Sequence, residues 1–241
     1  MSFPTILYAI LGGLLPALLW LWFWRHEDGR HPEPRRLIAI AFLAGVLAVP
    51  FAIPLEKFVL EEILGGQNVE LAAKALPLAA LLAVLLWAII EELLKFIAAY
   101  LSVLTRPSVD EPIDPVIYMI SAGLGFAAAE NIMFLIEPIL AGETTVSFMT
   151  GNLRFMGATL LHITASAIIG AALGFGFYKQ KKIRRRIAGL GVILAITLHT
   201  VFNFLIIIET PVGIFASFLL VWLAVIALIV ALEKVKRVHP A

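Results

Sequence analysis

The chain has 241 residues, of which 61% are hydrophobic and 15% charged, and its mean hydropathy is +1.00. Soluble domains are roughly 45–50% apolar and about 25% charged, so this composition favours a membrane protein over a soluble one. Cysteine is absent, which excludes disulfides, thiolate metal sites and cysteine nucleophiles. The net charge of +1 by itself indicates no particular partner.

Seven apolar runs can be read along the chain, and most reach the roughly 20 residues that a helix needs to cross a bilayer. They lie at 4–24, 37–55, 77–104, 115–136, 153–178, 187–208 and 211–232. The sequence therefore predicts an all-α polytopic membrane protein, with residues 1–241 forming one domain in the lipid bilayer. We expect spans three to six to form its core.

The second span and the segment that follows it depart from this regular pattern. The second run is short and contains Pro50 and Pro54, so we expect its end to be irregular. Residues 56–74 mix apolar residues with glutamates, which predicts an external interfacial segment with a break at Gly65-Gly66.

Most of the 18 lysines and arginines fall in connections on one side of the predicted bundle, after spans one, three, five and seven. They are Arg25, Arg30, Arg35, Arg36, Arg106, the basic residues of Lys179–Arg186, Lys234, Lys236 and Arg237. Only Lys57, Lys74 and Arg154 fall on the other side. Because basic connections stay in the cytoplasm, the N-terminus is predicted outside and the C-terminus inside. Topology already explains the basic run after span five, so we expect no nucleic-acid partner.

Three titratable residues, Glu91, Glu92 and Lys95, interrupt the third span. A charge near the centre of a bilayer costs at least about 2.5–3.5 kcal/mol. Lys95 follows Glu91 by four residues and Glu92 by three, so it can reach either carboxylate. A buried ion pair would explain Lys95 and one glutamate but not the second. A functional site explains all three better.

Polar residues also lie within the next three spans. Each alone has a plain explanation, because a buried histidine is usually a satisfied core group and an asparagine often bonds a neighbouring helix. Two histidines and three glutamates on four spans favour a shared site instead. The further residues are Phe126, Glu130 and Asn131 in span four, His162 in span five, and His199 and Asn203 in span six.

The depths of four of these residues agree. At a rise of 1.5 Å per residue, each lies about 18–25 Å above the cytoplasmic end of its own span. The four residues are Glu92, Glu130, His162 and His199. Spans three and five run inward while four and six run outward, so a common chain direction does not produce this agreement. The sequence therefore predicts one polar layer between the midplane and the outer face.

Proton transfer and metal binding both fit glutamates and histidines at one depth. A carboxylate can act as a general base, whereas histidines can bind Zn²⁺ or stabilise a developing oxyanion. The sequence lacks the His-Glu-x-x-His motif of common zinc proteases, so the need for a divalent metal stays open. Its candidate ligands are His162, His199 and Glu130.

These motifs, in this order, resemble those of the PrsW-type intramembrane proteases, a branch of the superfamily that includes CAAX prenyl proteases and bacteriocin-processing proteases. The motifs are Glu91-Glu92-x-x-Lys95, Phe126-x-x-x-Glu130-Asn131, His162 and His199-x-x-x-Asn203. The CAAX-type pattern has arginine after its glutamate pair and histidine in place of Glu130, so this sequence is closer to the PrsW branch. The resemblance implies an endopeptidase that cleaves membrane-anchored proteins, such as an anti-sigma factor, near the outer membrane face.

The resemblance also implies roles. Glu91 or Glu92 would activate a water for attack on a peptide carbonyl, and Lys95 would hold the pair. His162 and Glu130 would position the water or a metal. His199 and Asn203 would stabilise the oxyanion.

Other functions compete with proteolysis. A proton- or cation-coupled transporter also uses glutamate, histidine and lysine in mid-membrane, although we find neither paired broken helices nor inverted halves in the sequence. A CAAX-type prenyl-protein protease and a non-catalytic scaffold for another membrane protein are the remaining alternatives.

Overall fold

The computed structural model describes residues 3–26 and 32–240. In these residues the chain forms helices and no strand, and seven helices are long and apolar enough to cross a membrane. The all-α fold with seven spans is therefore confirmed. Arg30, which we counted with the basic residues after the first span, lies outside the described residues.

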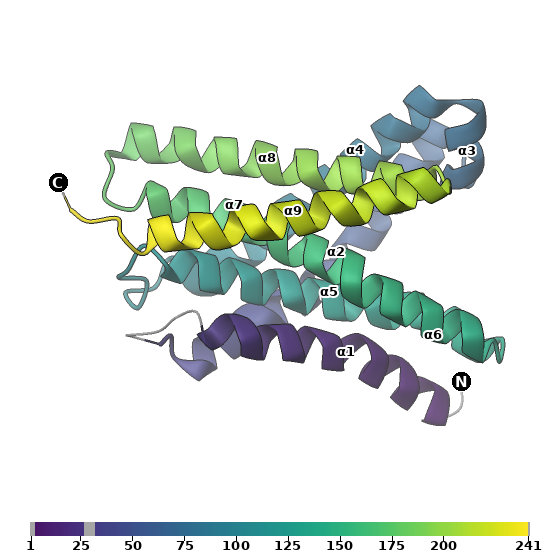
Figure 1. The fold of residues 1–241 in the computed structure, drawn as a ribbon, viewed down its shortest axis with the longest axis horizontal. Helices are drawn as coiled ribbons and strands as arrows, with labels where there is room; N and C mark the ends of the chain where they lie inside the picture. The colour runs from purple at the N-terminus through teal and green to yellow at the C-terminus, as the bar shows by residue number, and fades with distance from the viewer. Residues whose placement is uncertain (1–2, 27–31, 241) are drawn as a thin grey trace.

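The long helices run side by side, and the start of α1 and the end of α9 lie at opposite ends of the bundle (Figure 1). This arrangement fits an odd number of crossings, while the assignment of one end to the cytoplasm stays a prediction. The helices are α1 Phe3–His26, α2 Arg35–Leu64, α3 Val69–Ala75, α4 Pro77–Ala99, α5 Asp114–Leu140, α6 Thr144–Leu153, α7 Thr159–Phe175, α8 Lys181–Ile207 and α9 Pro211–Val235, with single π-helical turns η1 Tyr100–Leu104 and η2 Arg154–Ala158.

α2 is longer than the sequence suggested. It continues through Pro50 and Pro54 and ends only at Leu64, so the expectation of an irregular end near residue 55 was wrong. Each proline removes only its own N–H from the helix, and membrane helices tolerate that loss where neighbouring elements pack against them. The helix ends at the expected break, where Gly65 takes the left-handed conformation and its N–H donates to the carbonyl of Leu60.

α5 and α7 form the centre of the molecule. In their most apolar stretches 67% and 78% of the residues are buried, against 17% in α1 and 22% in α9. α5 packs against α1, α2 and α7, and α7 also packs against α8 and α9. Polar side chains on the inner faces of α5 and α7 are therefore enclosed by protein rather than by lipid.

α2 and α5 approach each other backbone to backbone. A Cβ atom on Gly45 would overlap the carbonyl of Ala122, and one on Gly125 would overlap the carbonyl of Phe42. Small residues permit such close contact between membrane helices, where van der Waals packing drives association. This contact fixes the position of α5, which carries Glu130, against α2.

Candidate functional site

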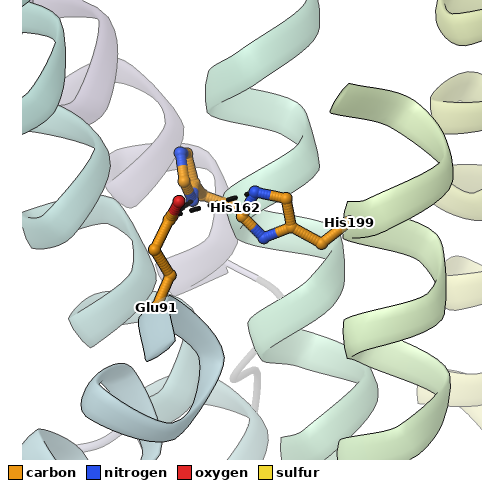
Figure 2. A group of neighbouring side chains, drawn as sticks. All are labelled: Glu91, His162 and His199. Atoms are coloured by element: carbon orange, nitrogen blue, oxygen red, sulfur yellow. Dashed lines mark ion pairs between the residues drawn. The ribbon is translucent and has the colours of Figure 1, made fainter. Parts of the chain in front are cut away.

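The predicted polar residues meet around one cavity near the middle of the bundle. Most are buried: Glu92 and Lys95 are 0% exposed and Glu91 is 5% exposed, whereas Glu130 and Asn203 are partly exposed. Figure 2 shows Glu91, His162 and His199 pointing toward one another from three different helices. α4 contributes Glu91, Glu92 and Lys95; α5 contributes Phe126, Glu130 and Asn131; α7 contributes His162; and α8 contributes His199 and Asn203.

Glu92 is the hub of the buried hydrogen bonds. Its Oε1 accepts from Lys95 Nζ at 2.5 Å and lies 2.6 Å from His199 Nδ1. Because an ionised carboxylate only accepts, His199 must carry its proton on Nδ1 to make this bond. The other ring nitrogen, Nε2, then has a free lone pair.

His162 is oriented by two partners of opposite charge, Lys95 and Glu130. Its Nδ1 lies 3.0 Å from Lys95 Nζ, and its Nε2 lies 2.7 Å from Glu130 Oε2. An ammonium group only donates, so Nδ1 accepts and Nε2 carries the proton that bonds Glu130. The ring also packs against Phe126, with the ring centroids 5.5 Å apart.

These bonds leave one unprotonated nitrogen of each imidazole near the same carboxylate oxygen. Glu91 Oε2 lies 3.8 Å from His162 Nδ1 and 3.8 Å from His199 Nε2 (Figure 2). That oxygen is buried and has no hydrogen-bond partner among the described residues. Glu91, His162 and His199 thus offer three ligand atoms within 4.8 Å of one another.

This donor set fits a catalytic zinc ion. Two imidazole nitrogens and one carboxylate oxygen leave a fourth position open, which is the usual pattern of a catalytic zinc site. Each histidine is also backed by a carboxylate, Glu92 for His199 and Glu130 for His162, as is common around bound metals. Of the ligands we expected, the two histidines converge, but Glu91 takes the place beside them and Glu130 supports His162 from behind.

Lys95 constrains any metal at this position. Its ammonium nitrogen already uses the His162 Nδ1 lone pair, so an ion and the ammonium compete for the same electron pair. Lys95 keeps Glu92 as a partner when it gives up His162. The lysine can therefore act as a movable counter-charge inside the site.

Sequence reasoning missed Arg154, which we had counted only as a basic residue of the outer side. Its Nη2 donates to Glu130 Oε2 at 2.8 Å, and its Nε donates to Asn131 Oδ1 at 2.5 Å. The amide of Asn131 donates in turn to Thr159 Oγ1 at 3.0 Å. Asn131 therefore joins α5 to the start of α7, in agreement with its interpretation as a bond between helices.

The cavity has a volume of about 620 Å³. Asn203 lines it one helical turn from His199, and Glu56 of α2 and Glu70 of α3 lie on its wall. A larger cavity of about 800 Å³ lies between α1, α5 and α6, but its lining is mainly apolar and includes none of the predicted site residues. The polar cavity is therefore the candidate site.

Comparison with known proteins gives a consistent result. A family model described as PrsW family intramembrane metalloprotease matches residues 33–231. The chain is 30% identical over 233 residues to a protein named Protease PrsW from Geobacillus kaustophilus (strain HTA426), covering 95% of this chain and 91% of that protein. A protein of the same name from Bacillus subtilis (strain 168) is 27% identical, covering 83% of this chain and 84% of that protein. One from Clostridioides difficile (strain 630) is 24% identical, covering 93% of this chain and 88% of that protein. No solved structure gives a significant match.

Proposed function

Because this chain belongs to the PrsW family of intramembrane metalloproteases, we propose that the cavity between α4, α5, α7 and α8 is where it hydrolyses a membrane-anchored protein. Family membership and the seven spans make it a multi-pass intramembrane protease, and they favour peptide hydrolysis over the transporter that the same residues also suggest. One observation carries the proposal: the unpaired Glu91 oxygen lies 3.8 Å from a ring nitrogen of each of two histidines in the cavity wall.

Without a metal, Glu91 is the proposed proton acceptor for the attacking water; with one bound, it would be a ligand instead. Its Oε2 is free of hydrogen bonds among the described residues, and Glu91 lines the cavity. Glu92 is held by Lys95 and His199, so we assign it to positioning rather than to proton transfer. A buried carboxylate can take a proton from water and return it to the leaving amine.

The two histidines orient groups at the point of attack. His199 Nε2 can accept a hydrogen bond from the water, and His162 Nδ1 can do so, or bind an ion together with Glu91 and His199, when Lys95 gives it up. A bound zinc ion would polarise the substrate carbonyl and make its water more acidic. Lys95 balances the negative charge of the glutamate pair.

Asn203 is the proposed donor to the oxyanion. The bond from His199 to Glu92 requires the His199 proton on Nδ1, so Nε2 has no N–H to donate into the cavity. We therefore assign His199 no oxyanion role. The amide of Asn203 lines the same cavity and can donate. A donor placed where negative charge develops stabilises the transition state more than the substrate.

The cavity wall supports a hydrophobic substrate segment. Ile53, Trp87 and Phe134 contribute apolar surface beside the polar residues. Binding sites of this kind combine apolar walls with a few polar groups that fix orientation. We propose cleavage near the outer face because the positive-inside rule predicts that the end of the bundle with few basic residues lies outside. An anti-sigma factor is the substrate that the family resemblance implies.

Cleavage by purified protein tests this proposal. Wild-type protein in lipid discs, incubated with single-span candidate substrates including an anti-sigma factor, should yield defined fragments. Glu91→Gln should yield none, whereas Glu61→Gln, a matched change on the exposed surface of α2, should cleave as the wild type does. Equal cleavage by the Glu91 and Glu61 variants would show that the site is assigned wrongly.

A further inference from the structure

Arg154 lies at the junction of α6 and α7, at the first position of the π-helical turn η2. Its side chain is 15% exposed and lines the same cavity as Glu91. The guanidinium donates to Glu130 and Asn131 and lies over the ring of Phe134, with Cζ 4.0 Å from the ring centroid. All three partners belong to α5.

The π-helical turn determines which way Arg154 points. His162 follows it by eight residues, and at about 100° per residue a regular α-helix would place the two about 80° apart. A π-helical turn adds one residue and removes about 100° of rotation, which leaves Arg154 about 20° from His162. Both side chains therefore face α5, where Glu130 lies between them.

Arg154 and His162 share one acceptor atom. Glu130 Oε2 accepts from Arg154 Nη2 at 2.8 Å and lies 2.7 Å from His162 Nε2. This oxygen, together with Lys95 Nζ at 3.0 Å from His162 Nδ1, keeps the His162 proton on Nε2. Loss of the Glu130 acceptor would remove one of the two contacts that keep Nδ1, which lies 3.8 Å from Glu91 Oε2, unprotonated.

We infer that Arg154 is a positioning residue for the active site: it holds Glu130 so that His162 keeps its proton on Nε2 and leaves Nδ1, 3.8 Å from Glu91 Oε2, unprotonated. The inference rests on the proposed function, because it treats His162 as part of the proteolytic site. Arginine suits the task, since its planar group donates from Nε and Nη2 to two separate acceptors while its face stacks on an aromatic ring. A lysine carries the same charge but cannot make both bonds in this plane.

The first test measures the histidine directly and needs no substrate. Nitrogen-15 NMR of metal-free, histidine-labelled protein distinguishes protonated from unprotonated ring nitrogens, and the chain has only 5 histidines. The His162 signals are identified by their loss in His162→Gln. We expect the wild type to carry the proton on Nε2 and Arg154→Gln to show a mixture of tautomers or a shift to Nδ1. An unchanged His162 spectrum in Arg154→Gln overturns the inference, whether or not the protein cleaves any substrate.

The second test measures cleavage. We expect Arg154→Gln to lower kcat about 10- to 100-fold, as loss of an outer partner of a site histidine does, with KM within about two-fold. Arg154→Lys should recover only part of the loss. Arg106→Gln, at an exposed arginine of the opposite end of the bundle, should behave as the wild type.

A double variant separates positioning from general destabilisation. In the Glu130→Gln background, Arg154→Gln should cause little further loss of kcat, because its effect passes through Glu130. Equal losses in both backgrounds, a rise in KM alone, or a lower melting temperature with kcat unchanged would each contradict the positioning role. Absence of cleavage by the wild type would instead refute the proposed function, and the NMR result would still decide the role of Arg154.

Discussion

Lys95 and Glu92 form an ion pair one helical turn apart on α4, with Nζ 2.5 Å from Oε1 and both side chains fully buried. This ion pair gives the two adjacent glutamates, Glu91 and Glu92, different surroundings, and the sequence alone does not distinguish them. Oε1 of Glu92 is committed to Lys95 and His199, and Oε2 of each glutamate is unpaired among the described residues; only the Oε2 of Glu91 lies 3.8 Å from both histidines. Neighbouring residues on a helix point about 100° apart, so each carboxylate meets different partners.

Glu91→Gln should abolish cleavage without unfolding the protein. The change removes a general base, which contributes about 10²–10⁴-fold in rate, while the affected Oε2 has no hydrogen bond to lose within the described chain. Initial rates and the melting temperature of the same purified variant check both parts. If folded Glu91→Gln protein cleaved at the wild-type rate, proton transfer would have to be assigned to another group.

Glu92→Gln should lose activity and also stability. Removing one member of a buried ion pair leaves the other charge uncompensated and costs about 3–5 kcal/mol. The melting temperature should therefore fall well below that of Glu91→Gln. The double change Glu92→Gln with Lys95→Met removes both charges and should recover part of this stability but not the activity. Equal melting temperatures for the two single glutamate variants would argue against the division of roles.

Much of the site could be predicted because charge inside a membrane is costly and helix geometry is regular. The positions of Glu92, Glu130, His162 and His199 along their spans were sufficient to predict that they share a layer, and their contacts confirm that they meet. The roles of the individual residues remain proposals. The resemblance to known motifs added the reaction but not the geometry.

Three features could not be predicted, and each has a physical reason. Arg154 was missed because a regular helical period places it about 80° from His162, and nothing in the sequence indicates the π-helical turn. Glu91 and Glu92 differ only in which neighbours surround them. Pro50 and Pro54 suggested the end of a helix, but packing against other helices keeps α2 continuous.

Metal removal should inactivate the enzyme if the three converging ligands hold zinc. We expect about one zinc per chain in the purified wild type, loss of activity with a chelator, and recovery on adding zinc. Glu91→Gln and His199→Ala should contain much less zinc by elemental analysis, whereas His239→Ala, at an exposed histidine, should keep it. A chelator-resistant wild type without zinc would favour a water activated by Glu91 alone.

The orientation of the bundle is a separate prediction. Because most basic residues cluster at one end, we expect the N-terminus outside and the C-terminus in the cytoplasm. Reporters that are active only in the cytoplasm or only outside, fused to each end and inserted between α7 and α8, will decide it. A cytoplasmic N-terminus would reverse the inferred side of cleavage.

Asn203→Ala should slow turnover far more than it weakens substrate binding. Asn203 lies on the cavity wall one turn from His199, and an amide that donates to the oxyanion acts mainly in the transition state. Loss of one such donor lowers the rate by about 10²–10³-fold. The competing interpretation is a hydrogen bond between helices, which is worth about 0.6 kcal/mol on average in membrane proteins. In that case the variant would keep most of its activity and melt at a lower temperature. Values of kcat, KM and melting temperature for one purified preparation separate the two, and retained kcat with a lowered melting temperature would rule out the oxyanion role.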